Sequence, residues 1–241
     1  MKRRLKIILL TFSVGLILFN CNSNSDTSSN ADGTENPTVP KNFKLISLGD
    51  SYTIGQSVCE SCRFPAQLKD SLQARYTELD TFNLEIIAQT GWTTTNLKNA
   101  ISSADPQTDF DLITLLIGVN NQYQNKPFEL YETEFVELVS TAISLVGGDA
   151  SKLIVVSIPD YAFTPFGNGN PSISQEIDNF NLVNQAITDS IGVSYFDITP
   201  ISREGLDKPE LVASDNLHPS GIQYSRWVEL FYDEVKLKVN D

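Results

Sequence analysis

From residue 43 onward the chain alternates short apolar runs with longer amphipathic segments, and this alternation limits the folds that it can adopt. The run at 111–117 is almost entirely apolar and β-branched, as expected for a central strand that is buried on both faces. Strands that alternate with helices predict an α/β fold with a mostly parallel sheet. We expect strands at 43–48, 82–87, 111–117, 152–158 and 193–196, and helices at 65–76, 94–101, 128–146, 174–191 and 220–239.

The N-terminal segment has the pattern of an export signal. Residues 1–6 are mostly basic and residues 7–19 are apolar, a stretch shorter than the roughly 20 residues that span a bilayer. The run Leu18-Phe19-Asn20-Cys21 resembles a bacterial lipobox, with Asn20 in place of the usual Gly, Ala or Ser. We predict a signal peptide at 1–20 and lipidation of Cys21. An uncleaved membrane anchor is the alternative, disfavoured because the segment is short.

Residues 22–40 are mainly Asn, Ser, Asp, Thr, Gly and Pro, with almost nothing to bury. This composition predicts a disordered tether over 21–41, which begins at the lipidated cysteine, and a folded domain over 42–241. Signal, cysteine and tether together predict an exported lipoprotein, periplasmic or on the cell surface, that is anchored to a bacterial membrane.

The net charge of −13 bears on possible partners. The chain shows no basic patch that could release counterions from phosphates, so nucleic acid is disfavoured as a partner. A solvated acidic surface explains the charge without any partner.

A serine directly follows the first predicted strand, in Gly49-Asp50-Ser51. Ligands in parallel α/β folds bind beyond the carboxyl ends of the strands, so this serine lies where chemistry is expected. Backbone N–H groups at the start of a following helix would favour a developing oxyanion. The tripeptide alone is weak evidence, because turns capped by Asp or Ser are common.

The chain contains one histidine, His218, three residues after Asp215. A serine hydroxyl is a poor nucleophile unless a base accepts its proton, and the base works best when a carboxylate fixes its tautomer. A single histidine is otherwise most often a surface or capping residue. The nearby carboxylate makes that alternative less attractive without removing it.

Two more polar segments, 89–94 and 118–121, follow the second and third predicted strands. Gly91 offers a backbone N–H that no side chain obstructs, and Asn120 offers a side-chain amide, as an oxyanion hole requires. Each segment by itself also fits a turn. Four polar sites at the ends of four different segments are harder to explain in that way.

These four segments resemble the conserved blocks of the SGNH/GDSL hydrolases, a family named for its Ser, Gly, Asn and His. Ser51 in Gly-Asp-Ser-Tyr-Thr-Ile-Gly matches the first block, Gly91 the second and Asn120 the third. Asp215 and His218 match the final Asp-x-x-His block, and the resemblance covers about residues 43–235.

The resemblance implies a flavodoxin-like three-layer α/β/α sandwich with a mostly parallel five-stranded sheet, and a site without metal or other cofactor. It implies that Ser51 attacks an ester carbonyl, that His218 takes its proton and that Asp215 orients His218. The oxyanion would be held by the N–H groups of Ser51 and Gly91 and by the Asn120 amide.

One position departs from the family pattern. Asn121 stands where the family usually has Asp. We expect this departure to affect the support of Asn120 rather than the reaction itself.

Cys59 and Cys62 form Cys-Glu-Ser-Cys after the first block. In a reducing compartment this motif would suit a redox pair or half of a zinc site. Zinc lacks its other ligands, because Cys21 lies across the tether and the histidine is already assigned. In an exported chain a local disulfide is the better interpretation, with a role in shaping the rim of the site.

Several aromatic side chains follow strand ends and either line an acyl- or sugar-binding cleft or pack loops onto the domain. The loop at 160–171 is rich in Gly, Asn and Pro and is a candidate mobile lid. The aromatic residues are Trp92, Tyr123, Tyr161, Phe163 and Phe166.

The leading functional hypothesis is a monomeric, lipid-anchored carboxylic-ester hydrolase that acts on lipid or acylated-carbohydrate esters outside the cytoplasm. The first alternative is a binding lipoprotein of the same fold that has lost turnover, against which the intact Ser51, Asp215 and His218 set speaks. The second is a thiol-redox lipoprotein built on Cys59 and Cys62, disfavoured because the surrounding pattern is not thioredoxin-like.

Overall fold

A computed structural model describes residues 39–239 of the chain. The predicted signal peptide, Cys21 and the predicted tether up to residue 38 lie outside the described residues, as do residues 240–241. In the part of the chain that is described, no helix is both long and apolar enough to cross a bilayer.

The described domain is built on one sheet of five parallel strands. The strands are β1 (Asn42–Gly49), β2 (Thr81–Ala88), β3 (Leu112–Leu116), β4 (Leu153–Val156) and β5 (Ser194–Phe196). Their order is β2-β1-β3-β4-β5. Gly49 at the end of β1 is level with Ala88 on one side and Leu116 on the other. The segments after these three strands therefore leave the sheet at the same edge.

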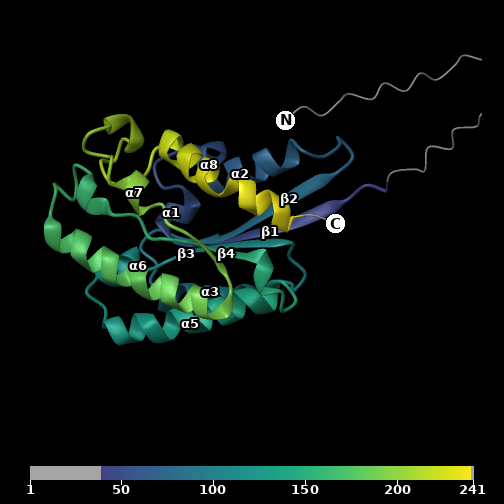
Figure 1. The fold of residues 1–241 in the computed structure, drawn as a ribbon, viewed down its shortest axis with the longest axis horizontal. Coiled ribbons are helices and arrows are strands. Elements are labelled where there is room, and N and C mark those ends of the chain that lie inside the picture. The colour runs from purple at the N-terminus through teal and green to yellow at the C-terminus, as the bar shows by residue number, and fades with distance from the viewer. Residues whose placement is uncertain (1–38, 240–241) are drawn as a thin grey trace, which may run out of the picture. The chain divides into compact units, whose positions relative to one another are not determined.

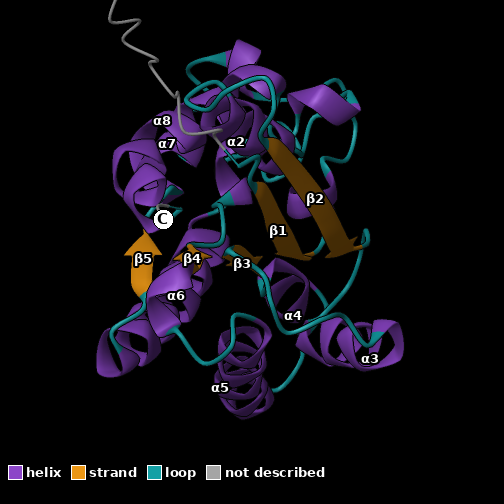
Figure 2. Ribbon diagram, turned by 90° about the vertical axis from the view of Figure 1, so that its right-hand side faces the viewer, coloured by secondary structure: helices purple, strands orange, loops and turns teal. Residues whose placement is uncertain are grey.

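Helices cover both faces of the sheet (Figures 1 and 2). One layer contains α2 (Phe64–Gln73), α7 (Thr199–Ser202) and α8 (Gly221–Lys238). The other contains α3 (Thr94–Ala104), α5 (Phe128–Leu145) and α6 (Pro171–Ile191), with α5 in contact with both neighbours. The strand order is that of flavodoxin-like folds. The α/β/α architecture predicted from the sequence is confirmed.

The core lies on both sides of the central strands. All residues of β3 and β4 are buried, whereas the edge strand β2 exposes alternate residues. The largest fully buried side chains include Trp227 and Tyr224 on α8 and Tyr131 on α5. These buried side chains anchor α8 and α5 to the sheet, and the anchored helices support the loops at the strand ends.

The helix expected at 65–76 ends at Gln73. Tyr76 leaves the helical path, and its ring packs edge-on against Phe43 at 4.8 Å and Phe82 at 5.1 Å between ring centroids. The helical spacing of apolar residues predicted a helix as far as Tyr76, because the turn after α2 also directs the Tyr76 ring onto the core.

The strand expected at 152–158 ends at Val156. The Asn181 side chain pairs with the backbone N–H and carbonyl of Ile158, at 2.9 and 3.0 Å, in place of a strand. The short helices α1 (Ser51–Ile54) and α4 (Val119–Tyr123), like α7, were not predicted, since so few residues carry no periodic signal.

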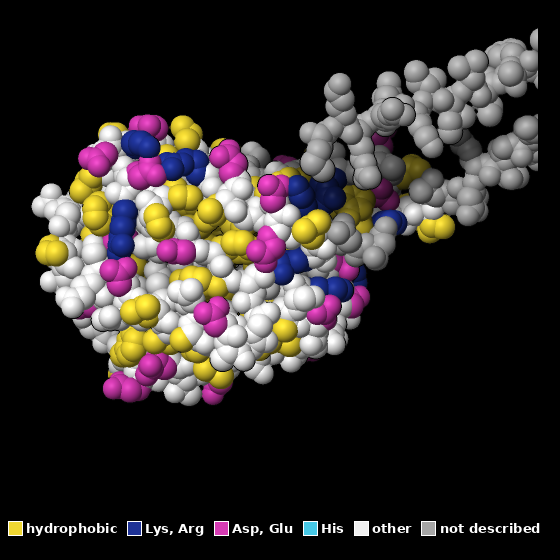
Figure 3. Space-filling view, in the orientation of Figure 1, with side chains coloured by type: hydrophobic (Ala, Val, Ile, Leu, Met, Phe, Trp, Pro, Cys, Tyr) yellow, Lys and Arg dark blue, Asp and Glu magenta, His cyan; other side chains and the backbone are white. Residues whose placement is uncertain are grey.

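Acidic and basic side chains are interspersed over the face of the domain in Figure 3. Among the ion pairs of the described domain, Glu204 pairs with Arg226 at 2.6 Å and also with Lys208. Such mixed charges fit a solvated surface and give no basic stripe on the face shown.

Candidate active site

Ser51 is the first residue of α1, directly beyond the end of β1. The turn between strand and helix is tight: a Cβ on Gly49 would lie 2.1 Å from Thr53 Oγ1 and 2.3 Å from the Leu116 carbonyl oxygen. Only glycine fits there. The geometry places Ser51 at a helix N-terminus, where backbone N–H groups lack partners within the helix and can face an anion.

Asp50 caps this helix and is completely buried. Its carboxylate accepts hydrogen bonds from the Tyr52 N–H at 3.0 Å and from Asn120 Nδ2 at 3.2 Å. Burial raises the pKa of Asp50 to about 7, although these hydrogen bonds oppose the rise. Sequence reasoning treated Asp50 only as part of a turn and missed its contact with Asn120.

Asp215 and His218 lie in the turn before α8, where Val212 and Pro219 form an antiparallel bridge. Asp215 Oδ1 accepts the backbone N–H groups of Leu217 at 3.0 Å and His218 at 2.9 Å. Asp215 Oδ2 lies 2.6 Å from His218 Nδ1. A carboxylate at this nitrogen favours the tautomer that carries its proton on Nδ1 and leaves Nε2 free to act as a base.

Ser57 contacts the same carboxylate. Its Oγ donates to Asp215 Oδ2 at 2.6 Å, although 158 positions separate the two residues. Partial burial raises the pKa of Asp215, but the hydrogen bonds from Ser57 and His218 outweigh it and lower the pKa to about 2. Sequence reasoning missed Ser57, because no spacing rule ties a loop serine to a carboxylate so far along the chain.

The predicted oxyanion donors come from the segments after β2 and β3. Gly91 has a φ of 84°, and a Cβ placed on it would meet nothing within 4 Å, so its backbone lies open. Asn120 lies in the first turn of α4, after Gly118, whose φ is 137°. A Cβ on Gly118 would lie 2.8 Å from the ring of Tyr131, so glycine is required for that approach.

These groups meet at one cavity of about 260 Å³. Among the described residues, no Asp, Glu, Lys or Arg contributes to its lining, so the cavity suits an uncharged ligand. The structure thus brings the predicted serine, glycine, asparagine and histidine together at the carboxyl edge of the sheet. The lining residues are Ser51, Tyr52, Thr90, Gly91, Val119, Asn120, Tyr123, Tyr161, Phe166, Leu217 and His218.

Three of the five aromatic residues singled out in the sequence line this cavity. Tyr123, Tyr161 and Phe166 form a cluster with ring centroids 6.1–6.2 Å apart, and Tyr123 and Phe166 are about half exposed. Trp92 instead packs against the hydrophobic core, and Phe163 is not among the lining residues. Both alternatives, cleft lining and loop packing, therefore apply to different members of the set.

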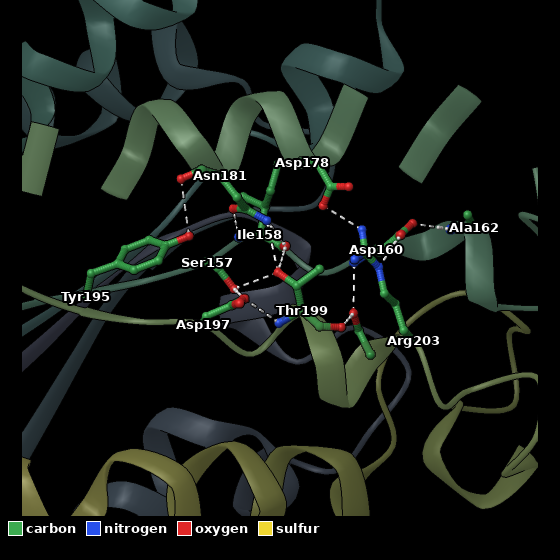
Figure 4. A network of polar contacts seen from close by, with 11 residues as sticks. Ser157, Ile158, Asp160, Ala162, Asp178, Asn181, Tyr195, Asp197, Thr199 and Arg203 are labelled. Carbon is green, nitrogen blue, oxygen red and sulfur yellow. Dashed lines mark hydrogen bonds and ion pairs between the residues drawn. The ribbon is translucent and has the colours of Figure 1, made fainter. Parts of the chain in front are cut away.

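The candidate lid at 160–171 begins in a network of polar contacts (Figure 4). Asp160 is completely buried, accepts the Ala162 N–H at 3.0 Å and pairs with Arg203 Nε at 2.9 Å. Farther along, the Phe166 N–H donates to the Asn216 carbonyl at 3.0 Å. The loop is thus tied to the end of α7 and to the segment that holds Asp215, and its residues Tyr161 and Phe166 line the cavity.

Asn121, at the position where the family usually has Asp, is completely buried. Its Oδ1 accepts the Thr94 N–H at 3.0 Å and its Nδ2 donates to Thr94 Oγ1 at 2.7 Å. Thr94 Oγ1 in turn donates to Glu134 at 2.5 Å. Asn121 therefore joins α4 to the start of α3 and is not among the residues that line the cavity, and its effect on the support of Asn120 stays a prediction.

Cys59 and Cys62 form a disulfide, with Cα atoms 5.0 Å apart, in the loop between α1 and α2. Neither cysteine lines the cavity. The pair therefore lies outside the cavity, on the loop that also carries Ser57.

The sequence model of the GDSL-like Lipase/Acylhydrolase family matches residues 47–226. The chain belongs to this family. Its members are ester hydrolases, and the resemblance stated from the four sequence blocks is confirmed at the level of the family and its SGNH fold. No curated protein matches the chain.

Solved structures of SGNH hydrolases are similar to this family member. Axe2, an acetylxylan esterase from Geobacillus stearothermophilus, is 22% identical with a TM-score of 0.62 over 81% of this chain and 95% of its own. The psychrotrophic esterase EstA from Pseudoalteromonas sp. is 17% identical with a TM-score of 0.57, over 82% and 99%. TesA is 14% identical with a TM-score of 0.61, over 81% and 99%. At such identities the likeness shows the shared fold.

Proposed function

We propose that this ester-hydrolase family member works by serine chemistry, with Ser51 as nucleophile, His218 as general base and Asp215 as the residue that orients His218. One observation carries the proposal. Ser51, His218 and the two oxyanion donors Gly91 and Asn120 come from four separate segments yet line one uncharged cavity. A turn-forming role for each residue does not explain why the four converge.

The proposed reaction is acyl transfer in two steps. Ser51 Oγ attacks the ester carbonyl while His218 Nε2 accepts the hydroxyl proton, and His218 then gives this proton to the leaving alcohol. Water next attacks the acyl-serine, His218 accepts its proton and returns it to Ser51 Oγ, and the carboxylic acid leaves. In both steps the N–H groups of Ser51 and Gly91 and the Asn120 amide hold the oxyanion.

The cavity supports an uncharged acyl ester as substrate. Val119 and Leu217 contribute apolar surface to its lining, and Tyr123 and Phe166 contribute aromatic rings that are about half exposed. Such rings suit the apolar face of a sugar or a lipid-like alcohol. We propose acylated carbohydrate or lipid esters as the substrate class. Acetylxylan, for which the similar esterase Axe2 is named, is an acylated carbohydrate of this kind.

Reaction with a fluorophosphonate probe tests the nucleophile. The unmutated chain should be labelled covalently and Ser51→Ala should not, whereas Ser71→Ala, which removes a hydroxyl bonded to the Gln67 carbonyl on α2, should be labelled normally. Equal labelling of the unmutated chain and Ser51→Ala, or labelling of neither, would remove the proposal. p-Nitrophenyl esters of increasing acyl length would then measure how much acyl chain the cavity accepts.

We also propose that the chain works outside the cytoplasm as a lipoprotein attached through Cys21. The N-terminal pattern and the disulfide support this proposal, because disulfides persist in oxidising compartments. Cells that express the chain should incorporate labelled palmitate into it, and Cys21→Ser should abolish the label. An unlabelled chain in the soluble fraction would contradict the proposal.

A further inference from the structure

The hydroxyl of Ser57 and the ring of His218 share one oxygen of Asp215. Ser57 Oγ and His218 Nδ1 each lie 2.6 Å from Asp215 Oδ2, while Oδ1 is occupied by two backbone N–H groups. The carboxylate is therefore held on three sides: by its own turn, by the imidazole and by a side chain from a distant loop. The loop of Ser57 connects α1, which begins with Ser51, to α2.

The backbone at Ser57 adopts a conformation that serine rarely takes. Its φ is 66°, in the left-handed region, which costs a residue with a side chain roughly 1 kcal/mol. Gly55, two residues earlier, has a φ of 73°, and a Cβ there would lie 2.5 Å from Arg63 Cβ. Two left-handed residues in close succession turn the loop sharply and direct the Ser57 hydroxyl to Asp215.

The Cys59–Cys62 disulfide closes the end of this loop, and Cys62 packs against the start of α8. Gln67 Nε2 donates both to the Cys62 carbonyl at 2.5 Å and to the Gly221 carbonyl at 3.0 Å. A Cβ on Gly221 would lie only 3.2 Å from Cys62 Cβ, so the two backbones pack closely. Gly221 begins α8, three residues after His218, so the disulfide lies against the segment that carries the proposed base.

We propose that Ser57 is a positioning residue that holds the Asp215 carboxylate against His218, and that the Cys59–Cys62 disulfide keeps Ser57 in place. This inference rests on the proposed serine mechanism. Without Ser57, Oδ2 loses its second donor, so the carboxylate is held only by His218 and by the two backbone N–H groups at Oδ1, and Oδ2 can shift away from the imidazole. His218 would then spend less time with Nε2 directed at Ser51, so turnover falls while substrate contacts stay the same.

The test compares three variants of Ser57 with one control variant, at Ser61 of the same loop. Ser57→Gly removes the hydroxyl and also removes the strain of the left-handed backbone, because glycine adopts positive φ freely. Ser57→Ala removes the hydroxyl and keeps that strain. Ser57→Asn keeps a hydrogen-bond donor in a residue that tolerates positive φ. Ser61→Ala, in the same loop, removes an exposed hydroxyl that does not contact Asp215. Fluorophosphonate titration gives the concentration of reactive sites, so kcat refers to folded enzyme.

We expect Ser57→Gly and Ser57→Ala to lower kcat about tenfold, the size of one hydrogen bond to a charged group, with KM unchanged. Ser57→Asn should recover part of the loss, and Ser61→Ala should match the unmutated chain. A Ser57→Gly kcat equal to that of the unmutated chain would overturn the inference, as would a loss of the same size in Ser57→Asn. Absence of probe labelling in the unmutated chain would instead remove the proposed function.

The disulfide is tested by its dependence on Ser57. The double variant Cys59→Ser/Cys62→Ser should lower kcat in the unmutated background and cause no further loss in the Ser57→Gly background. Losses of equal size in both backgrounds, or no loss in either, would show that the disulfide does not act through Ser57.

Discussion

Asp50 and Asn120 are joined by a hydrogen bond across 70 positions of the chain, from Asn120 Nδ2 to Asp50 Oδ2 at 3.2 Å. Asp50 precedes the proposed nucleophile, and Asn120 lies in α4 after the neighbouring strand. One N–H of the amide is directed to the buried carboxylate, which leaves the other for the cavity that Asn120 lines. This contact therefore fixes the Asn120 amide, the proposed oxyanion donor, relative to the segment that begins α1 at Ser51.

Removal of this donor should affect the rate far more than the fold. We expect Asn120→Ala to lower kcat by about 10²- to 10³-fold, the range observed when one oxyanion donor is lost. Steady-state kinetics with a p-nitrophenyl ester measures this. Asn179→Ala, on an exposed position of α6, is the matched control and should leave kcat unchanged. A loss below threefold in Asn120→Ala would show that the amide does not face the oxyanion.

The raised pKa of Asp50 predicts a pH dependence of stability. Between its ordinary pKa of 3.8 and the folded value of about 7, the folded state binds more protons than the unfolded state. The contribution of Asp50 to the free energy of unfolding should therefore fall as pH rises through this window, by up to about 4 kcal/mol, and level off above it.

Urea unfolding of the unmutated chain and of Asp50→Asn from pH 5 to pH 8 measures this contribution as a difference, in which the other titrating groups cancel. Asp215, whose folded pKa is about 2, stays ionised throughout this range. The unmutated chain should lose stability relative to Asp50→Asn as pH rises. Parallel curves for the two proteins would contradict the raised pKa.

The sequence was sufficient to predict the sheet and the convergence of the four blocks, because parallel strands place their carboxyl ends at one edge. It could not reveal the partners of those blocks. Asp50 looks like an ordinary helix cap, and its contact with Asn120 depends on the register of β1 against β3. Ser57 is a polar residue in a loop, and only the folded chain brings it to Asp215. Periodicity reports which face of an element is buried, and these contacts join residues of loops and of very short helices, which carry no periodic pattern.

The replacement of the usual Asp by Asn121 should be coupled to Glu134. The Asn121 amide donates to Thr94 Oγ1, so the threonine proton is free to go to Glu134. An Asp at 121 would compete with Glu134 for that proton and bring two buried carboxylates together. We expect Asn121→Asp to lower the free energy of unfolding by about 2 kcal/mol at pH 7.

Addition of Glu134→Gln to Asn121→Asp should restore part of that loss, since it removes one of the two carboxylates. Glu137→Gln, at an exposed glutamate that pairs with the same Lys98, is the control and should restore nothing. Urea unfolding of the single and double variants measures the coupling. Additive effects of Asn121→Asp and Glu134→Gln would contradict it.

Arg203 should be required for the stability of the loop that carries Tyr161 and Phe166. Its guanidinium contacts two carboxylates, Asp160, which is completely buried, and Asp178, whose side chain is 53% exposed. Arg203→Met would leave Asp160 buried without its cationic partner, at a cost of about 2 kcal/mol once the partial exposure of Arg203 is taken into account. Asp178→Asn removes only the exposed contact and should change the free energy of unfolding by less than about 0.5 kcal/mol.

Because Asp160 caps the short helix that begins at Tyr161, Arg203→Met should also raise KM for esters while Asp178→Asn should not. Equal effects of the two substitutions on unfolding and on KM would show that the buried pair does not hold this wall of the cavity.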